Sequence, residues 1–176
     1  MTAGDVAALL IYVVQGLGVL LGVGAETVLL VLYLLALHSP LKSHEHMTRV
    51  ARRARSWALF LIITSGIGAV LYQLMTGEPG VLFAPAFIFK WLLIIAVLAL
   101  YFAARKYSAH GVVEGLSGAH WYALFLVHTI APVTTWAILG SLYAAWLVFF
   151  AALWGGFSLL MRGAKKSSGT IPVSNP

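Results

Sequence analysis

The feature of this sequence that most constrains its fold is a stretch of 41 residues, 121–161, without a single Asp, Glu, Lys or Arg. Three other long apolar runs precede it, at about residues 6–37, 56–75 and 85–104. The hydrocarbon layer of a bilayer is about 30 Å thick, and an α-helix of roughly 20 apolar residues crosses it. Charged residues make up 9% of the chain, against about a quarter of a typical soluble domain. The sequence therefore predicts an all-α integral membrane protein.

The number of membrane crossings follows from the lengths of these runs. The first run has 32 residues, roughly 48 Å as a helix, and we expect it to form one long span. The 41 uncharged residues are too many for one span and fit two, at about 119–139 and 142–161, with Gly140 and Ser141 as the tight reversal between them. Together with the two middle runs, this gives a polytopic helical bundle of five spans.

The positions of the basic residues predict the orientation of the bundle. Ten of the eleven Lys and Arg residues fall in three segments, 38–55, 105–118 and 162–176. Five spans place these three segments on one side, and cytoplasmic loops carry an excess of Lys and Arg. We therefore expect an N-terminus outside the cytoplasm, a cytoplasmic C-terminus, and a bacterial or archaeal plasma (inner) membrane. One transmembrane domain covers residues 1–166, and a flexible tail covers 167–176.

Composition also excludes several classes of function. The chain has no cysteine, which removes disulfides, thiolate metal sites and iron–sulfur clusters. The net charge of +6 comes from basic residues at the ends of apolar runs, where anionic lipid headgroups explain them. The bilayer, and not a nucleic acid, is therefore the expected partner. No HExxH, GxSxG or glycine-rich phosphate loop is present, so the sequence favours a protein that is not an enzyme.

Polar residues inside the spans are the candidates for function, because they are expensive to bury in lipid. Glu26 shares one face of the first span with Gln15, Gly18 and Gly22. We expect the two glycines to let a neighbouring helix approach closely and Glu26 to point into the bundle. The polar residues in other spans that could complete a buried polar site with Glu26 and Gln15 are Lys90, His128, Thr64 and Ser65.

Two interpretations of these residues stay open. In the first, Glu26 and His128, with or without Lys90, bind or relay a proton, an ion or a small polar ligand. In the second, Glu26 is a neutral or paired carboxyl group that fixes helix packing, and Lys90 extends its ammonium group to the lipid headgroups.

The histidines suggest a separate cofactor hypothesis. His38 ends the first span and His120 begins the fourth at the same membrane surface, where the two side chains, or the more deeply placed His128, could ligate haem b or a metal. His44 and His46 could chelate a divalent cation, although such a pair is also typical of a solvated loop.

Two segments, GLGVLLGVGAET at 16–27 and FIFKWLLIIAVLAL at 87–100, resemble the first and third helices of small bacterial membrane proteins related to the CopD-like group. The resemblance covers about a third of the chain. It implies a helical bundle of this size, with haem-linked or copper-linked roles in some relatives. In haem-associated relatives a histidine tends to precede the first glycine cluster, where this chain has Gln15, so no site residue is carried over.

Our leading hypothesis is a non-enzymatic membrane protein with a buried polar site. It would act as a small transport or proton-coupled component, or as an accessory subunit of a larger complex. Other membrane subunits or further copies of the chain would then be its partners. The alternative is a membrane b-type cytochrome with a His-ligated haem, and a purely structural subunit is a third hypothesis.

Overall fold

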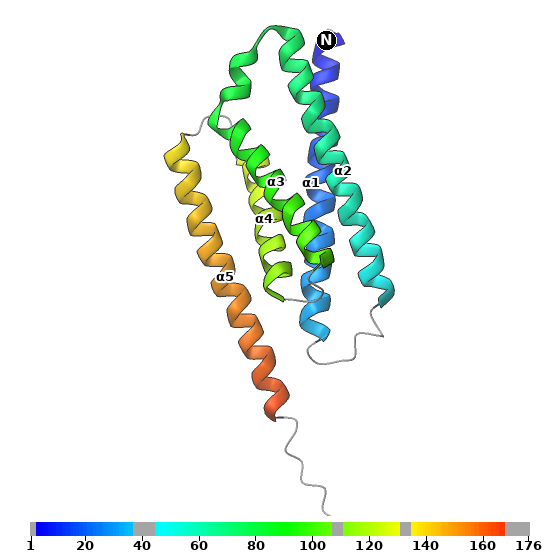
Figure 1. Cartoon of the computed structure of the whole chain (residues 1–176), viewed down its shortest axis with the longest axis vertical. Coiled ribbons are helices and arrows are strands. Elements are labelled where there is room, and N and C mark those ends of the chain that lie inside the picture. The colour runs from blue at the N-terminus through cyan, green and yellow to red at the C-terminus, as the bar shows by residue number, and fades with distance from the viewer. Residues whose placement is uncertain (1–2, 37–44, 107–110, 131–134, 168–176) are drawn as a thin grey trace, which may run out of the picture.

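The computed structural model describes residues 3–36, 45–106, 111–130 and 135–167, and within these ranges the chain is all-α, as predicted. Its elements in chain order (Figure 1) are α1 Ala3–Ala36, α2 Glu45–Thr76, the short 3-10 helix η2 Pro79–Phe83, α3 Pro85–Lys106, α4 Gly111–Ile130 and α5 Trp136–Ser167.

Successive helices alternate in direction along the bundle (Figure 1). The start of α1, the connection from α2 through η2 to α3, the end of α4 and the start of α5 lie at one end, which we call the N-terminal face. The end of α1, the start of α2, the end of α3 and the start of α4 lie toward the opposite face. The arginines in the first turns of α2, Arg49, Arg52 and Arg53, are therefore close to the opposite face.

Four helices of the described residues are long and apolar enough to cross a membrane, over Gly4–Leu35, Glu45–Thr76, Pro85–Ala103 and Trp136–Phe157. The chain is therefore a multi-pass helical membrane protein. The second helix is longer than the predicted apolar run at 56–75, because α2 already begins at Glu45. Its polar first turns are supported by an exposed ion pair between Glu45 and Arg49, which are four residues apart.

The predicted reversal at Gly140 and Ser141 is wrong, because both residues lie inside α5. Ser141 satisfies its hydroxyl by donating to the carbonyl oxygen of Ala137, one turn earlier. α4 ends at Ile130 and α5 begins at Trp136, several residues before the predicted reversal. Thr135 stands directly before α5 and accepts a hydrogen bond from the amide of Ile138 at 3.5 Å, which is the geometry of a helix N-cap.

The core of the bundle surrounds α4, which packs against α1, α3 and α5. Its fully buried side chains include Trp121, Leu124, Ile62, Val19 and Val97, contributed by four different helices. α5 lies at the edge of the bundle and has the smallest buried share of the four candidate spans.

Two glycines of α1 allow close helix contacts, on the face where the sequence placed them. A Cβ atom at Gly18 would lie 2.8 Å from Cγ1 of Ile62 in α2. At Gly22 it would lie 1.9 Å from the indole of Trp121 in α4. A side chain at either position would collide with the neighbouring helix, so this face of α1 is where α2 and α4 approach most closely.

Candidate functional site

Three of the predicted polar residues meet in one cluster. The Lys90 cluster consists of Gln15 from α1, Lys90 from α3 and His128 from α4. The Lys90 ammonium donates to Gln15 Oε1 at 2.6 Å and lies 3.1 Å from His128 Nδ1. The ring of Tyr12, one turn before Gln15, stacks on His128 with the ring centroids 4.9 Å apart. The ammonium of Lys90 therefore contacts side chains inside the bundle and does not extend to the lipid headgroups.

The charge in this cluster has no acidic partner. A lysine ammonium only donates hydrogen bonds, so His128 accepts through Nδ1 and carries its proton on Nε2, as a neutral ring. None of the ion pairs among the described residues includes Lys90. Gln15 and His128 occupy two of the three N–H donors of the Lys90 ammonium, so its third N–H is available to a ligand.

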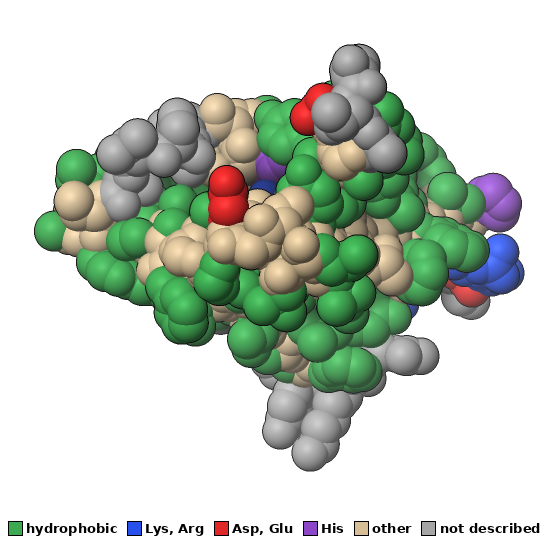
Figure 2. Space-filling view, turned by 90° about the horizontal axis from the view of Figure 1, so that it is seen from above, with side chains coloured by type: hydrophobic (Ala, Val, Ile, Leu, Met, Phe, Trp, Pro, Cys, Tyr) green, Lys and Arg blue, Asp and Glu red, His purple; other side chains and the backbone are tan. Residues whose placement is uncertain are grey.

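The Lys90 cluster borders a cavity of about 220 Å³ between α1, α2 and α3. Its lining residues are Ala8, Ile11, Tyr12, Gln15, Gly66, Ala69, Tyr72, Gln73, Phe87, Lys90, Trp91 and Ile94. The side-chain oxygen of Gln73 is buried and has no hydrogen-bond partner among the described residues. Seen from the N-terminal face, a basic side chain and a histidine are recessed between hydrophobic side chains (Figure 2).

Glu26 belongs to a second cluster and not to the Lys90 cluster. The Arg55 cluster consists of Glu26 from α1, Arg55 from α2 and Glu114 from α4. Arg55 Nη1 donates to Glu26 Oε2 at 3.2 Å and to Glu114 Oε2 at 3.3 Å. Its guanidinium also lies 5.5 Å from the centre of the Tyr101 ring. Glu26 is fully buried, Arg55 is 3% exposed and the Glu114 side chain is 16% exposed, so the bundle encloses the Arg55–Glu26 pair and leaves Glu114 at its edge.

The predicted site that combined Glu26 with Lys90 and His128 is therefore not what the structure shows, because Glu26 contacts Arg55. Gln15 and Glu26 are eleven residues apart on α1, which is roughly 16 Å along a helix. Sequence reasoning missed Arg55 and Glu114 because it assigned both to polar segments outside the spans. A signal was present: Arg55 continues the helical spacing of the buried α2 residues, which are Ala51, Ala58, Leu59, Ile62, Ser65 and Gly66.

A buried tryptophan separates the two clusters. Trp121 packs against Gly22, which lies between Gln15 and Glu26 on α1. On α4, Trp121 itself lies between Glu114 and His128. The indole is fully buried, and its N–H has no hydrogen-bond partner in the part of the chain that the structure describes. The Lys90 cluster and the Arg55 cluster therefore lie at two different levels of the bundle, with the Trp121 side chain between them.

Thr64 and Ser65, also predicted for the polar site, use their hydroxyls within α2. Thr64 Oγ1 donates to the carbonyl oxygen of Phe60 at 2.7 Å, and its side chain faces outward. Ser65 Oγ donates to the carbonyl oxygen of Leu61 at 2.6 Å. Such bonds to the preceding turn satisfy a hydroxyl in lipid without any partner helix.

Of the histidines proposed as haem or metal ligands, the structure describes His120 and His128, and these two do not form a ligand pair. His120 donates through Nδ1 to the carbonyl oxygen of Leu116 at 2.7 Å and accepts through Nε2 from the Tyr143 hydroxyl at 2.7 Å. Both of its ring nitrogens are therefore occupied, whereas an axial ligand needs one of them free. His128 Nδ1 faces Lys90. His38 and His44 lie outside the described residues, within which no group of three metal-binding side chains occurs.

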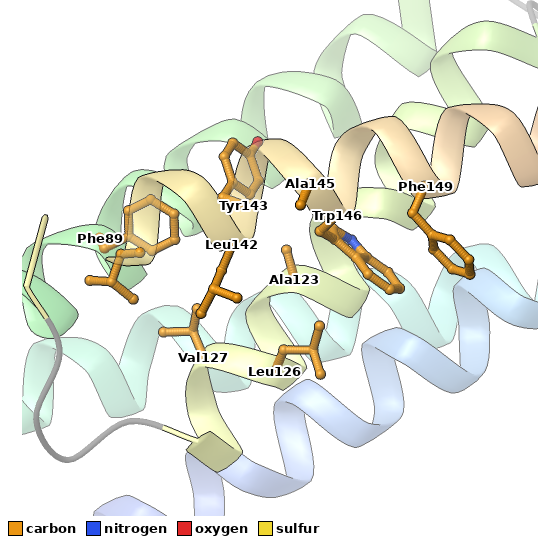
Figure 3. Close-up of a pocket in the computed structure, with 10 residues that line it drawn as sticks. Phe89, Ala123, Leu126, Val127, Leu142, Tyr143, Ala145, Trp146 and Phe149 are labelled. Carbon is orange, nitrogen blue, oxygen red and sulfur yellow. The ribbon is translucent and has the colours of Figure 1, made fainter. Parts of the chain in front are cut away.

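A larger apolar cavity of about 300 Å³ lies between α3, α4 and α5 (Figure 3). Figure 3 shows Phe89, Leu142, Tyr143, Trp146 and Phe149 around it. Its two polar groups are already engaged, because the Tyr143 hydroxyl bonds to His120 and the Trp146 N–H donates to the Ala119 carbonyl oxygen at 2.9 Å. This cavity has no free polar group to orient a ligand, so the Lys90 cluster is the stronger candidate site.

Comparison with known proteins adds no family to this description. The chain matches no protein-family model, no curated protein sequence and no solved structure at a significant level. The resemblance of residues 16–27 and 87–100 to CopD-like proteins therefore stays a prediction.

Proposed function

We propose that this protein is a five-crossing component of a bacterial or archaeal plasma membrane that binds a small polar solute and takes part in its transport. The observation that carries the proposal is the cavity beside Lys90. It combines a charged donor, two amides and two tyrosines inside a bundle whose outer surface is apolar. Polar groups at this depth are retained only at a cost, so a ligand that uses them is the simplest reason for their presence.

The alternation of the helices supports five crossings. α3 ends toward the opposite face and α5 begins at the N-terminal face (Figure 1). α4 joins these two levels with 20 residues, roughly 30 Å of helix. The basic turns of α2 lie toward the opposite face, so the positive-inside rule favours a cytoplasmic location for that face. The cavity then opens toward the outside of the cell.

The arrangement of polar groups favours passage of a solute over chemistry on it. The Lys90 cluster and the Arg55 cluster lie on opposite sides of Trp121 along α4. Neither cluster contains a serine, threonine or cysteine beside a base, the arrangement that many hydrolases with a covalent intermediate use. A solute bound beside Lys90 would meet the Trp121 indole next on its way inward.

Uptake by proteoliposomes tests this function. Purified protein is reconstituted at pH 7.5, and entry of radiolabelled glycerol, alanine and lactate is followed by rapid filtration. We expect at least one of these solutes to enter faster than into protein-free liposomes. The excess rate should fall at least tenfold with Lys90→Met, because this change removes the charged donor and keeps a side chain of similar length.

The matched control is Arg52→Gln, which removes one positive charge from an exposed position of α2. Its uptake should remain within about twofold of wild type, since a rim charge is screened by solvent. Uptake no faster than into empty liposomes for all three solutes, or an excess rate unchanged by Lys90→Met, would contradict the transport function.

A further inference from the structure

We infer that the solute bound beside Lys90 is a short-chain monocarboxylate. This inference deepens the proposed function and rests on it. The first step is the charge of the site. Lys90 is the one ionised side chain among the twelve lining residues, none of which is acidic. An ionised group in a low-dielectric interior is stabilised strongly by an opposite charge. A ligand with one negative charge supplies it.

The second step is the set of hydrogen-bond donors carried by the residues that line the cavity. Lys90 retains one N–H beyond those used by Gln15 and His128. Tyr12, Tyr72 and Gln73, whose side chains carry hydroxyl and amide donors, line the same cavity. A carboxylate accepts through two oxygens with about four lone-pair sites, so it can use the ammonium together with a neighbouring hydroxyl. The buried oxygen of Gln73, which lacks a partner, would accept from a hydroxyl group on the ligand.

The third step is the size and polarity of the remaining wall. A volume of about 220 Å³ lies below the roughly 300–1,000 Å³ of pockets for drug-sized ligands. Ile11, Phe87, Trp91 and Ile94 make up much of the wall. This wall suits a short hydrocarbon group and offers nothing to a second charge. An anion with one charged end and a small apolar end therefore fits better than an inorganic divalent anion.

Calorimetric titration of the full chain in nanodiscs tests the ligand class. The probes are sodium propionate and sodium lactate in chloride-free buffer, against their neutral isosteres propionamide and lactamide. We expect the carboxylates to bind wild type at least tenfold more tightly than the amides. Lys90→Met should weaken carboxylate binding at least tenfold and leave the weak amide binding within twofold.

Two variants keep this test decisive. Lys90→Gln is measured beside Lys90→Met, with the melting temperature of each as the check on folding, and Arg52→Gln is the control for net charge. Equal affinity for carboxylates and amides, no carboxylate binding at all, or carboxylate binding that survives both Lys90 variants would overturn the inference. Uptake of glycerol that depends on Lys90 would still support the transport function in those cases, so the two proposals fail separately.

Discussion

At the scale of single residues, the contact between Gly22 and Trp121 is the tightest point of the bundle. Gly22→Ala places a methyl group where the indole now lies, 1.9 Å from its nearest carbon. Because Trp121 is fully buried, it has no free space to move into. We expect a loss of about 1–3 kcal/mol in the free energy of unfolding, the usual cost of an overpacked core. Unfolding in detergent followed by tryptophan fluorescence measures it.

The control for that substitution lies half a turn away on the same helix. Gly24 is exposed, and a Cβ atom there meets nothing within 4 Å. Gly24→Ala should be neutral or stabilising by up to about 1 kcal/mol, because alanine is the better helix former. Equal effects of the two substitutions would show that the Gly22–Trp121 contact does not form.

Arg55 gives a second prediction at the residue scale. Arg55→Met removes the partner of two carboxylates, of which Glu26 is fully buried. Breaking a buried pair on one side typically costs about 3–5 kcal/mol, because the remaining charge is uncompensated. We expect a loss of that order in SDS-induced unfolding. A stability equal to wild type would show that Arg55 is not in contact with Glu26.

Arg49→Met serves as the matched control for Arg55→Met. Arg49 pairs with Glu45 through side chains that are 62% and 70% exposed, and such surface pairs contribute about 0.2–1 kcal/mol at most. Its effect should therefore be small.

These residues also mark how far the sequence could predict the site. The cost of burying polar groups identified Gln15, Lys90 and His128 as inward-facing, and the structure brings the three together. Helical periodicity gives the face of a residue and a rough depth, but it does not give the rotation of one helix against another. Glu26 was grouped with Lys90 because its rough depth matched, whereas the two residues lie at different levels of the bundle and the contact of Glu26 is Arg55.

At the scale of elements, the connection from α4 to α5 was the part that hydropathy located wrongly. Glycine and serine at 140–141 are typical turn residues, but both are also common inside transmembrane helices. Pro132 was the better signal, because proline lacks the amide hydrogen that a helix interior needs. The length of the 41-residue run predicted two helices correctly. Because the run is uniformly hydrophobic, its hydropathy gave no indication of where α4 ends.

The docking of α5 yields a prediction at this scale. Trp146 anchors α5 to α4 by donating its indole N–H to the Ala119 carbonyl oxygen. Trp146→Phe retains an aromatic ring and removes this donor. We expect a loss of about 0.5–1.5 kcal/mol, the usual net contribution of one hydrogen bond, measured as a lower melting temperature in detergent.

Trp136→Phe is the comparison, since Trp136 is 47% exposed at the start of α5. The melting temperature of this variant should stay close to that of wild type. A larger drop for Trp136→Phe than for Trp146→Phe would contradict the described packing of α5.

At the scale of the whole molecule, composition determined most of what could be predicted. A chain that is 61% apolar and has long uncharged runs has few alternatives to a helical membrane bundle, because every backbone polar group must be satisfied in lipid. The alternation of helices then follows from short connections. The cavity beside Lys90 was not predictable in this way, since it depends on how the side chains of α1, α2 and α3 pack against one another.

The accessibility of one introduced cysteine shows whether this cavity opens to the outer face of a five-crossing bundle, as we propose. The chain has no native cysteine, so Ala69→Cys, in the cavity wall, provides a single thiol. Ile67→Cys, two residues away and exposed on the outside of the bundle, is the control, because a thiol in lipid does not ionise and reacts slowly.

A membrane-impermeant maleimide is added to right-side-out and to inside-out vesicles that contain each variant. We expect labelling of Ala69→Cys in right-side-out vesicles alone, and no labelling of Ile67→Cys in either preparation. Labelling of Ala69→Cys only in inside-out vesicles would reverse the proposed orientation. No labelling of Ala69→Cys from either side would contradict an open polar cavity.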